Sequence, residues 1–325
     1  MRLGPEWKSK DFHSGLLFCL FAKTSNHSTV RILLISFKNY LFMKYLVLGS
    51  EGQVGAALVA YLKGKGEEVL EFDIVNSVDQ DLRTHANPLL DSLVKEADFV
   101  FFLAFDVGGS RYLKVYQQTI DFISNNTKII NNTFDVIHKY NKPFIFASSQ
   151  MSNMSYSSYG RLKAVGESYT EILGGIVVKF WNVYGIEHDL DKSHVITDLI
   201  IKAHDTGTID LLTTGEEERQ FLFADDCCEA LIALSEKYNE IPRDKELHVT
   251  NFEWTNILNV ADIIAAHFPG STIVPAVSKD EVQKDKRNEP NPFIHTYWKS
   301  TIKLEDGIAK IVATMKADPA RFFKK

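Results

Sequence analysis

Short apolar runs alternate with longer segments of helical periodicity from residue 44 onward. The apolar runs are rich in Val, Ile, Leu and Phe, as expected for strands that are covered on both faces. They lie at residues 44–48, 68–72, 99–103, 143–146 and 175–180. The intervening segments predict helices at residues 53–65, 112–140, which can break near Asn125, and 158–173. This alternation predicts an α/β fold with an open, doubly wound parallel sheet, because right-handed crossovers join consecutive parallel strands.

The pattern becomes less regular after Asn182. Helices are predicted at residues 194–204, 225–237, 257–268 and 304–315, with a turn at 213–218. The stretch 278–292 is highly charged and contains Pro290 and Pro292, which indicates a surface loop. We therefore expect a large domain at 43–181 and a smaller, discontinuous α/β part at 182–325, from which 225–250 returns to the large domain.

The composition and charge of the chain argue against several classes of binding partner. The chain has 325 residues, is 45% hydrophobic and carries a formal net charge of −6, with Lys and Arg scattered along it. Because nucleic-acid binding needs a basic patch, we expect no nucleic-acid partner. The three cysteines, Cys19, Cys227 and Cys228, cannot build a disulfide framework or a zinc site, and His194 and His204 lack partners at metal-ligand spacing. These features predict a cytoplasmic protein without a metal.

The first 42 residues differ from the rest. Their apolar runs at 16–22 and 32–37 are separated by Lys23 and a polar stretch. Each run is far shorter than the roughly 20 residues that a membrane span needs, so we expect no membrane insertion. A secretory signal is an alternative, because basic residues precede a short apolar run. Since Met43 stands where a nucleotide-binding domain would naturally begin, we expect residues 1–42 to be an appendage outside the fold.

A glycine-rich turn follows the first predicted strand. Gly49, Gly52 and Gly55 are spaced for a tight turn and for close approach of the backbone to a pyrophosphate, with Gln53 and Val54 opening the helix. Asp73 ends the next predicted strand about 20 residues further on. A carboxylate there accepts hydrogen bonds from the adenosine ribose and repels a 2′-phosphate. The turn therefore predicts a dinucleotide site that favours NAD over NADP.

Tyr159 and Lys163 are four residues apart on a predicted helix and so share one face. An ammonium beside a phenol stabilises the phenolate, so we expect Lys163 to lower the pKa of Tyr159. Ser149, at the end of the preceding strand, can bond to the same substrate oxygen. These three residues are the predicted catalytic group.

These motifs together resemble the extended short-chain dehydrogenase/reductase family, in its nucleotide-sugar epimerase/dehydratase branch. The resemblance runs from Met43 to about the C-terminus and includes further segments in chain order. They are the adenine-contacting Asp81-Leu82-Arg83, Leu103 and Ala104 beside the cofactor, Asn126 on the following helix, Asn182 within 179–185, and Arg219 within 219–226.

The resemblance implies that Tyr159 takes the proton of the sugar C4 hydroxyl, and that Lys163 also holds the nicotinamide ribose. Gln150 and Met151 stand where members that eliminate water or carbon dioxide carry an acid, and where one kind of 3,5-epimerase carries a cysteine. Neither side chain is a general acid or base. This favours C4 epimerisation, or a net oxidation or reduction at C4, over dehydration and decarboxylation. An inactive NAD-binding sensor or scaffold is the alternative of another class.

The substrate is expected to be a nucleotide-diphosphate sugar. Asn182, Arg219 and Arg287 are its expected diphosphate or sugar ligands, and Gly108 and Gly109 its expected sugar-lining turn. Only nine residues separate Ser149 from Tyr159, fewer than is usual in the family, which fits either a more open site or a bulkier sugar. Relatives pair through the helices before and carrying Tyr159, so a homodimer is expected. The apolar positions of the earlier helix fit an interface or an intramolecular core equally: Ile129, Ile130, Phe134 and Ile137.

Overall fold

The computed structural model describes residues 43–283 and 288–323. The first 42 residues and Arg287, for which we stated expectations, lie outside the described residues. The described residues form one compact unit. Among the described residues, no helix has the length and apolar character to cross a membrane.

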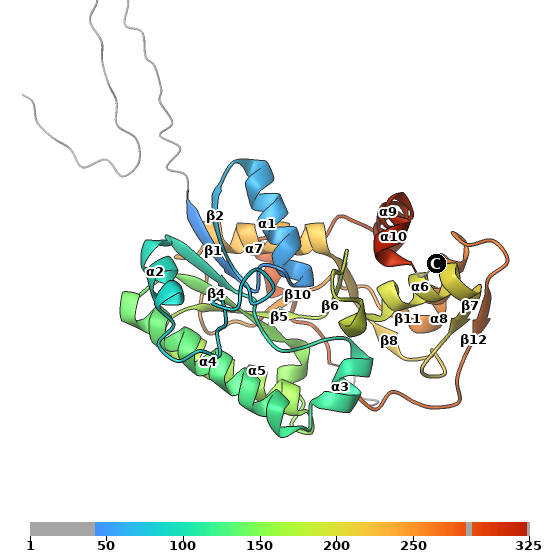
Figure 1. Cartoon of the computed structure of the whole chain (residues 1–325), viewed down its shortest axis with the longest axis horizontal. Helices are drawn as coiled ribbons and strands as arrows, with labels where there is room; N and C mark the ends of the chain where they lie inside the picture. The colour runs from blue at the N-terminus through green and yellow to red at the C-terminus, as the bar shows by residue number, and fades with distance from the viewer. Residues whose placement is uncertain (1–42, 284–287, 324–325) are drawn as a thin grey trace, which may run out of the picture. The chain divides into compact units, whose positions relative to one another are not determined.

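A six-stranded, all-parallel sheet forms the centre of this unit (Figure 1). Its order is β10-β5-β4-β3-β1-β2. The strands are β1 (Lys44–Leu48), β2 (Glu68–Phe72), β3 (Phe99–Phe102), β4 (Phe144–Ser149), β5 (Ile176–Phe180) and β10 (Leu247–Val249). The strand order reverses between β1 and β3, so a crevice opens there at the carboxyl ends of the strands. The predicted doubly wound α/β fold is confirmed.

Helices cover both faces of this sheet. On one face α1 (Gln53–Lys65) packs against α7 (Ala224–Glu236), and on the other lie α2 (Pro88–Glu96), α4 (Ile120–Tyr140) and α5 (Ser158–Ile172) (Figure 1). Side chains of β3 alternate between the two layers, because successive residues of a strand point to opposite faces. Phe99 and Phe101 join the core under α1 and α7, whereas Val100 and Phe102 join the core under α4.

The remaining elements form a second, smaller part of the structure, which has its own apolar core. Its strands form two-stranded pairs: β6 (Asn182–Tyr184) with β9 (Phe221–Phe223), β7 (Thr208–Asp210) with β12 (Thr272–Val274), and β8 (Glu218–Arg219) with β11 (Thr255–Asn256). Its helices are α6 (Val195–Thr206), α8 (Ile257–Ala265), α9 (Leu304–Ala317) and α10 (Pro319–Phe322). Short 3-10 turns are η1 (Gln150–Asn153), η2 (Leu190–Lys192) and η3 (Pro292–Thr296). Between β9 and α8 the chain returns to the large sheet through α7 and β10, which pairs with β5.

Two helix predictions need correction. The segment predicted as one helix, with a break near Asn125, is two helices, α3 (Ser110–Tyr116) and α4. The break lies at 117–119, because the Thr119 hydroxyl accepts a hydrogen bond from the Phe122 N–H at 3.2 Å and so caps α4. Helix α2 was missed altogether. Its signal was present as an Asn-Pro start: the Asn87 side chain accepts from two N–H groups of α2, and Pro88 fills the first turn.

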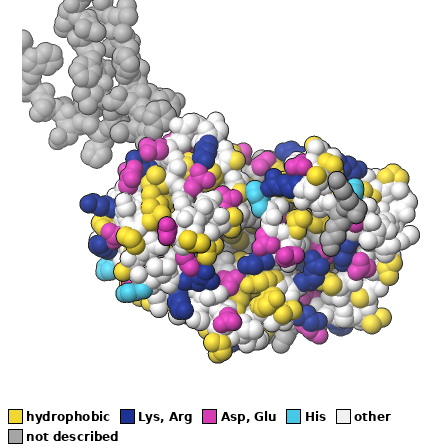
Figure 2. Space-filling model, in the orientation of Figure 1, with side chains coloured by type: hydrophobic (Ala, Val, Ile, Leu, Met, Phe, Trp, Pro, Cys, Tyr) yellow, Lys and Arg dark blue, Asp and Glu magenta, His cyan; other side chains and the backbone are white. Residues whose placement is uncertain are grey.

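The apolar residues predicted for either an interface or a core on α4 belong to the core. Ile129, Ile130, Phe134 and Ile137 are all buried against the sheet. Exposed apolar side chains on α4 and α5 are instead Ile120, Ile123, Val165 and Ile172. On the face seen in Figure 2, Lys and Arg side chains are scattered among acidic and apolar ones instead of gathering in one patch.

Candidate functional site

A cavity of about 680 Å³ opens at the carboxyl ends of the central strands. It is lined by the glycine turn after β1, the ends of β2, β3, β4 and β5, the start of α5 and the segment around η2. Most of the predicted site residues line it: Gly49, Gly52, Gln53, Val54, Gly55, Asp73, Asp81, Leu82, Leu103, Ala104, Gly108, Gly109, Ser149, Tyr159, Lys163 and Asn182.

The glycine turn is shaped by close backbone contacts. Gly49 has φ 88°, a left-handed conformation, and its N–H donates to the Phe72 carbonyl at 2.9 Å. A Cβ at Gly55 would lie 1.9 Å from the Gly49 carbonyl oxygen, so only glycine fits there. The N-cap of α1 is Gly52, and no side chain of the described chain caps this helix. Its first N–H groups are therefore left for an anion, as a dinucleotide pyrophosphate requires.

Acidic residues line the next part of the cavity. The Asp73 carboxylate accepts hydrogen bonds from the backbone N–H groups of Glu51 and Val75, each at 3.0 Å, which ties β2 to the glycine turn. Asp81 binds the Arg83 guanidinium in a bidentate pair, with contacts of 2.8–3.1 Å. The Arg83 hydrogen bonds hold the pKa of Asp81 below its usual value, against the opposing effect of partial burial. These groups form a polar end of the cavity.

Tyr159 and Lys163 lie together at the other end of the cavity, on the first turns of α5. The Ser157 hydroxyl caps this helix by accepting from the Gly160 N–H at 3.0 Å. The Tyr159 ring packs edge-on against Phe105 at 5.7 Å between centroids. The Lys163 amino group donates to the Ala147 carbonyl at 2.6 Å and lies 3.8 Å from the centre of the Phe105 ring. Phe105 thus fixes both side chains.

The expectation that Lys163 lowers the pKa of Tyr159 is not met in this structure. Burial raises the pKa of Tyr159 to about 12, with a hydrogen bond to Ser149 acting in the opposite direction. Burial lowers the pKa of Lys163 to about 7. The amino group lies 5.9 Å from the centre of the Tyr159 ring and uses its hydrogen bond on Ala147. Desolvation is therefore the largest cause of both pKa shifts.

Replacing Lys163 by Met should raise the melting temperature, and the gain should shrink as the pH rises. In the folded chain Lys163 has a pKa near 7, against 10.5 for an ordinary lysine. Below pH 7 the folded protein bears the full cost of a buried ammonium. Between pH 7 and 10.5 the unfolded chain holds a proton that the folded chain has released, so wild-type stability rises by up to about 1.4 kcal/mol per pH unit.

Calorimetry of wild type and Lys163→Met at pH 6.5 and 9.5 measures this difference. Lys142→Met, which removes an amino group that also donates to backbone carbonyls but belongs to a half-buried residue, serves as the control. A gain for Lys163→Met that is the same at both pH values would contradict the assigned pKa.

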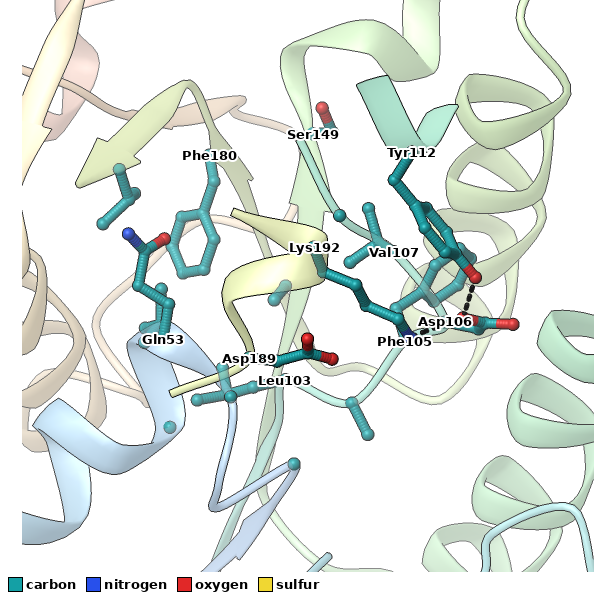
Figure 3. Close-up of a pocket in the computed structure, with 18 of the residues that line it drawn as sticks. Gln53, Leu103, Phe105, Asp106, Val107, Tyr112, Ser149, Phe180, Asp189 and Lys192 are labelled. Atoms are coloured by element: carbon teal, nitrogen blue, oxygen red, sulfur yellow. Dashed lines mark hydrogen bonds and ion pairs between the residues drawn. The ribbon is translucent and has the colours of Figure 1, made fainter. Parts of the chain in front are cut away.

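Beyond Phe105, the chain places a polar cluster that sequence reasoning missed. The Asp106 carboxylate accepts from the Tyr112 hydroxyl at 2.6 Å, from the Asn125 amide at 3.1 Å and from the Lys192 ammonium at 3.2 Å. Figure 3 shows Asp106, Tyr112 and Lys192 across the cavity from Gln53. Asp106 could have been suspected from its place just after the predicted strand end. Lys192 comes from η2, more than 80 residues away, and no local pattern indicates their contact.

Gly108 and Gly109 make this cluster compact. A Cβ at Gly109 would lie 2.3 Å from the Ser193 carbonyl oxygen, and one at Gly108 would lie 3.0 Å from Lys192 Cβ. The Gly109 N–H donates to the Lys192 carbonyl at 3.0 Å. The glycines therefore serve the close docking of η2 as well as lining the cavity.

A second pair missed from sequence lies on the same side. The buried Glu187 carboxylate binds the His194 ring nitrogen Nδ1 at 2.6 Å and also accepts from the His194 backbone N–H. Burial would raise the pKa of Glu187, but the hydrogen bonds and charge of His194 outweigh it, and the pKa lies below its usual value. Both residues line the cavity.

Three predicted ligands are placed differently from the rest. Asn126 is fully buried and does not line the cavity; its amide bonds both the N–H and the carbonyl of Asp106, so it holds the loop after β3. Arg219 also lies outside the cavity lining and forms an ion pair with Asp280. The Asn182 amide reaches the lining but donates to the Gln220 carbonyl at 3.1 Å.

Residues 45–249 match the NAD dependent epimerase/dehydratase family. GDP-L-fucose synthase of Sinorhizobium fredii is 30% identical over 138 residues, which cover 40% of this chain and only 43% of that protein. UDP-glucuronic acid decarboxylase 1 of Arabidopsis thaliana is 20% identical over 311 residues, or 84% of this chain and 70% of that protein.

Solved structures share the fold. An epimerase from Methanothermobacter thermautotrophicus superimposes with a TM-score of 0.76 at 17% identity, covering 86% of this chain and 94% of that chain. The Bordetella bronchiseptica enzyme WbmF, solved with NAD+ and UDP, gives 0.72 at 21% identity, covering 86% and 94%. The family match spans well over half of the chain, and its glycine turn and Tyr159–Lys163 pair share one cavity. The chain belongs to the NAD dependent epimerase/dehydratase family.

Proposed function

We propose that this chain is a nucleotide-sugar epimerase that inverts the sugar at C4 through a 4-keto intermediate. One observation carries the proposal. Ser149, Tyr159 and Lys163 line the same cavity as a glycine turn shaped for a dinucleotide, while Gln150 and Met151, directly after Ser149, offer no group that exchanges protons. The resemblance implies that members that eliminate water or carbon dioxide carry such a group at these two positions, whereas C4 epimerisation needs none there.

The family is NAD-dependent, and the residues present fit NAD. The pyrophosphate would lie on the N-terminus of α1 at Gly49, Gly52 and Gly55, and the adenosine ribose would lie at Asp73. Bound NAD supplies a reversible hydride acceptor for the C4 hydrogen of the sugar.

Side chains of this protein would transfer the proton of the C4 hydroxyl group. Tyr159, which lines the cavity, would accept the C4 hydroxyl proton and later return it, and Ser149 would hydrogen-bond to the same C4 oxygen. Lys163, held by Ala147 and Phe105, would hold the nicotinamide ribose and add positive charge when protonated. Inversion at C4 would then require the keto intermediate to turn and present its other face before the hydride returns.

The expected substrate ligands remain part of the proposal. Asn182 lines the cavity, and Arg219 would exchange Asp280 for the substrate diphosphate. The expected cytoplasmic location and homodimer are also proposed, with the exposed apolar side chains of α4 and α5, such as Ile120 and Ile172, as the candidate contact.

Incubating the full chain with UDP-, GDP-, CDP- and dTDP-hexoses, followed by NMR of the products, tests this function. We expect inversion at C4 without added cofactor and without net change in NADH absorbance. A stoichiometric change in NADH absorbance would instead establish a 4-dehydrogenase or 4-ketoreductase. Binding of NAD with no turnover of any nucleotide sugar would establish the non-catalytic alternative.

A further inference from the structure

The sugar end of the cavity contains more acidic than basic side chains. Beyond Phe105, its charged lining consists of Asp106, Glu187, Asp189 and Lys192, with His188 and His194. Glu187 and His194 pair with each other at 2.6 Å. The His188 ring nitrogen Nδ1 lies 3.0 Å from the Arg321 guanidinium. A single ammonium, on Lys192, therefore stands among the carboxylates of this lining.

That ammonium is already committed to a carboxylate. Lys192 Nζ lies 3.2 Å from Asp106 Oδ1 and 4.8 Å from the centre of the Tyr112 ring. The Asp189 carboxylate points into the cavity below Lys192 (Figure 3), and it is close enough to act electrostatically on Tyr112. An anionic substituent entering here would meet two carboxylates and one ammonium that is already paired.

The cluster is also fixed in place. The Asn126 amide bonds both backbone groups of Asp106, and Tyr112 and Asn125 hold its side chain. The Lys192 carbonyl accepts a hydrogen bond from the Gly109 N–H. Nearby, Arg111 of α3 forms an ion pair of 2.7 Å with Asp198 of α6. Because these groups are held before any ligand enters, the cluster cannot easily rearrange to present Lys192 alone.

We propose that Asp106, Lys192 and Asp189 form a sugar subsite that accepts a neutral or amino-substituted glycosyl group and discriminates against a uronosyl group. The inference rests on the proposed function, since it takes a nucleotide sugar as the substrate. An acceptor on Asp106 and a donor on Lys192, about one hydrogen-bond length apart, match a hydroxyl group, which both donates and accepts. A carboxylate accepts only, and it would be repelled by the two acids.

Binding of matched ligands to the NAD-loaded full chain tests the subsite, independently of turnover. The probes are UDP, GDP, CDP and dTDP alone and, on each nucleotide, glucose, glucosamine and glucuronate, titrated by calorimetry. We expect glucuronate to bind at least about 10-fold more weakly than glucose on the same nucleotide, corresponding to about 1.4 kcal/mol. Glucuronate binding as tightly as glucose or more tightly would overturn the inference.

Two variants locate the effect. Asp106→Asn and Asp189→Asn should each reduce the glucuronate penalty by about threefold or more, without altering affinity for the nucleotide alone. Asp189 is exposed and is the safer variant for folding. Asp191→Asn removes the same charge from the same η2 segment outside the cavity lining and should leave the penalty unchanged. An unchanged penalty in both lining variants would overturn the assignment.

The experiment separates the two levels of the proposal. If none of UDP, GDP, CDP and dTDP, with or without a sugar, binds to the chain, the proposed function and the inference that rests on it both fail. If the nucleotides and neutral sugars bind but glucuronate is not disfavoured, the subsite inference alone fails.

Discussion

Tyr159→Phe should lower turnover by about 10²–10⁴-fold while leaving the fold and NAD binding intact. The substitution removes only the phenol oxygen, the group proposed to carry the C4 hydroxyl proton. The ring keeps its edge-on contact with Phe105, so the loop after β3 and the Lys163 side chain stay in place. We expect the loss mainly in kcat, because the oxygen acts on the reacting atom instead of on the nucleotide.

Steady-state kinetics and NAD titrations of the purified variant measure this effect. Tyr169→Phe is the matched control: it removes a phenol oxygen from the same helix α5, where that oxygen bonds Asn131 at 3.1 Å outside the cavity lining. The control should retain wild-type turnover. Undiminished turnover of Tyr159→Phe would discredit Tyr159 as the proton carrier.

Gly55→Ala should weaken NAD binding by about 10–100-fold. The new Cβ would lie 1.9 Å from the Gly49 carbonyl oxygen and 3.1 Å from Ser50 Cα, both in the glycine turn. Because these neighbours are backbone, the turn itself must open. Opening it moves the N–H groups at the start of α1 away from the pyrophosphate and costs about 1–3 kcal/mol of overpacking.

The same helix offers a control for this substitution. Gly64, near the end of α1, has nothing within 4 Å of its added Cβ. Gly64→Ala should keep NAD affinity and raise the free energy of unfolding by up to about 1 kcal/mol, because alanine favours a helix interior over glycine. Equal NAD affinities for Gly55→Ala and Gly64→Ala would show that the turn does not hold the cofactor.

Most of the central sheet could be predicted from sequence because its signals are local. Strands buried on both faces produce continuous apolar runs, and the glycine turn stands directly after the first of them. The prediction of one helix over 112–140 was wrong because the cap at Thr119 is a single side chain within a long periodic segment. Helix α2 was missed although Asn87 and Pro88 mark its start, because only two of its nine residues, Leu90 and Val94, are buried and its apolar pattern is short.

The polar half of the site could be predicted only in part. Ser149, Tyr159 and Lys163 lie close together in the sequence, so their spacing predicted that they form one group. Asp106 and Lys192 are instead brought into contact by the packing of η2 against the loop after β3. No periodicity encodes that contact. The pKa values of Tyr159 and Lys163 depend on burial, which the four-residue spacing does not report. The spacing predicted the shared face correctly and the sign of the Tyr159 shift wrongly.

A positive charge in the cavity would change the pKa values of both Tyr159 and Lys163. Positive charge near Tyr159 and Lys163 lowers both pKa values, because it stabilises a phenolate and disfavours an ammonium. In this structure the pKa of Tyr159 must fall from about 12 before this residue can act as a base near neutral pH. Activity that depends on its deprotonation should therefore rise with pH across the neutral range.

The proposed reaction requires that hydride leaves C4 of a sugar that is held against Tyr159. A single-turnover experiment with nucleotide hexoses carrying deuterium at C4, or at C3 or C5 as controls, tests it most directly. We predict transient absorbance of bound reduced nicotinamide, formed several-fold more slowly with deuterium at C4 only, and a C4-inverted product that retains the label. No reduced nicotinamide with any nucleotide sugar, or slowing by deuterium at C3 or C5 instead, would contradict it.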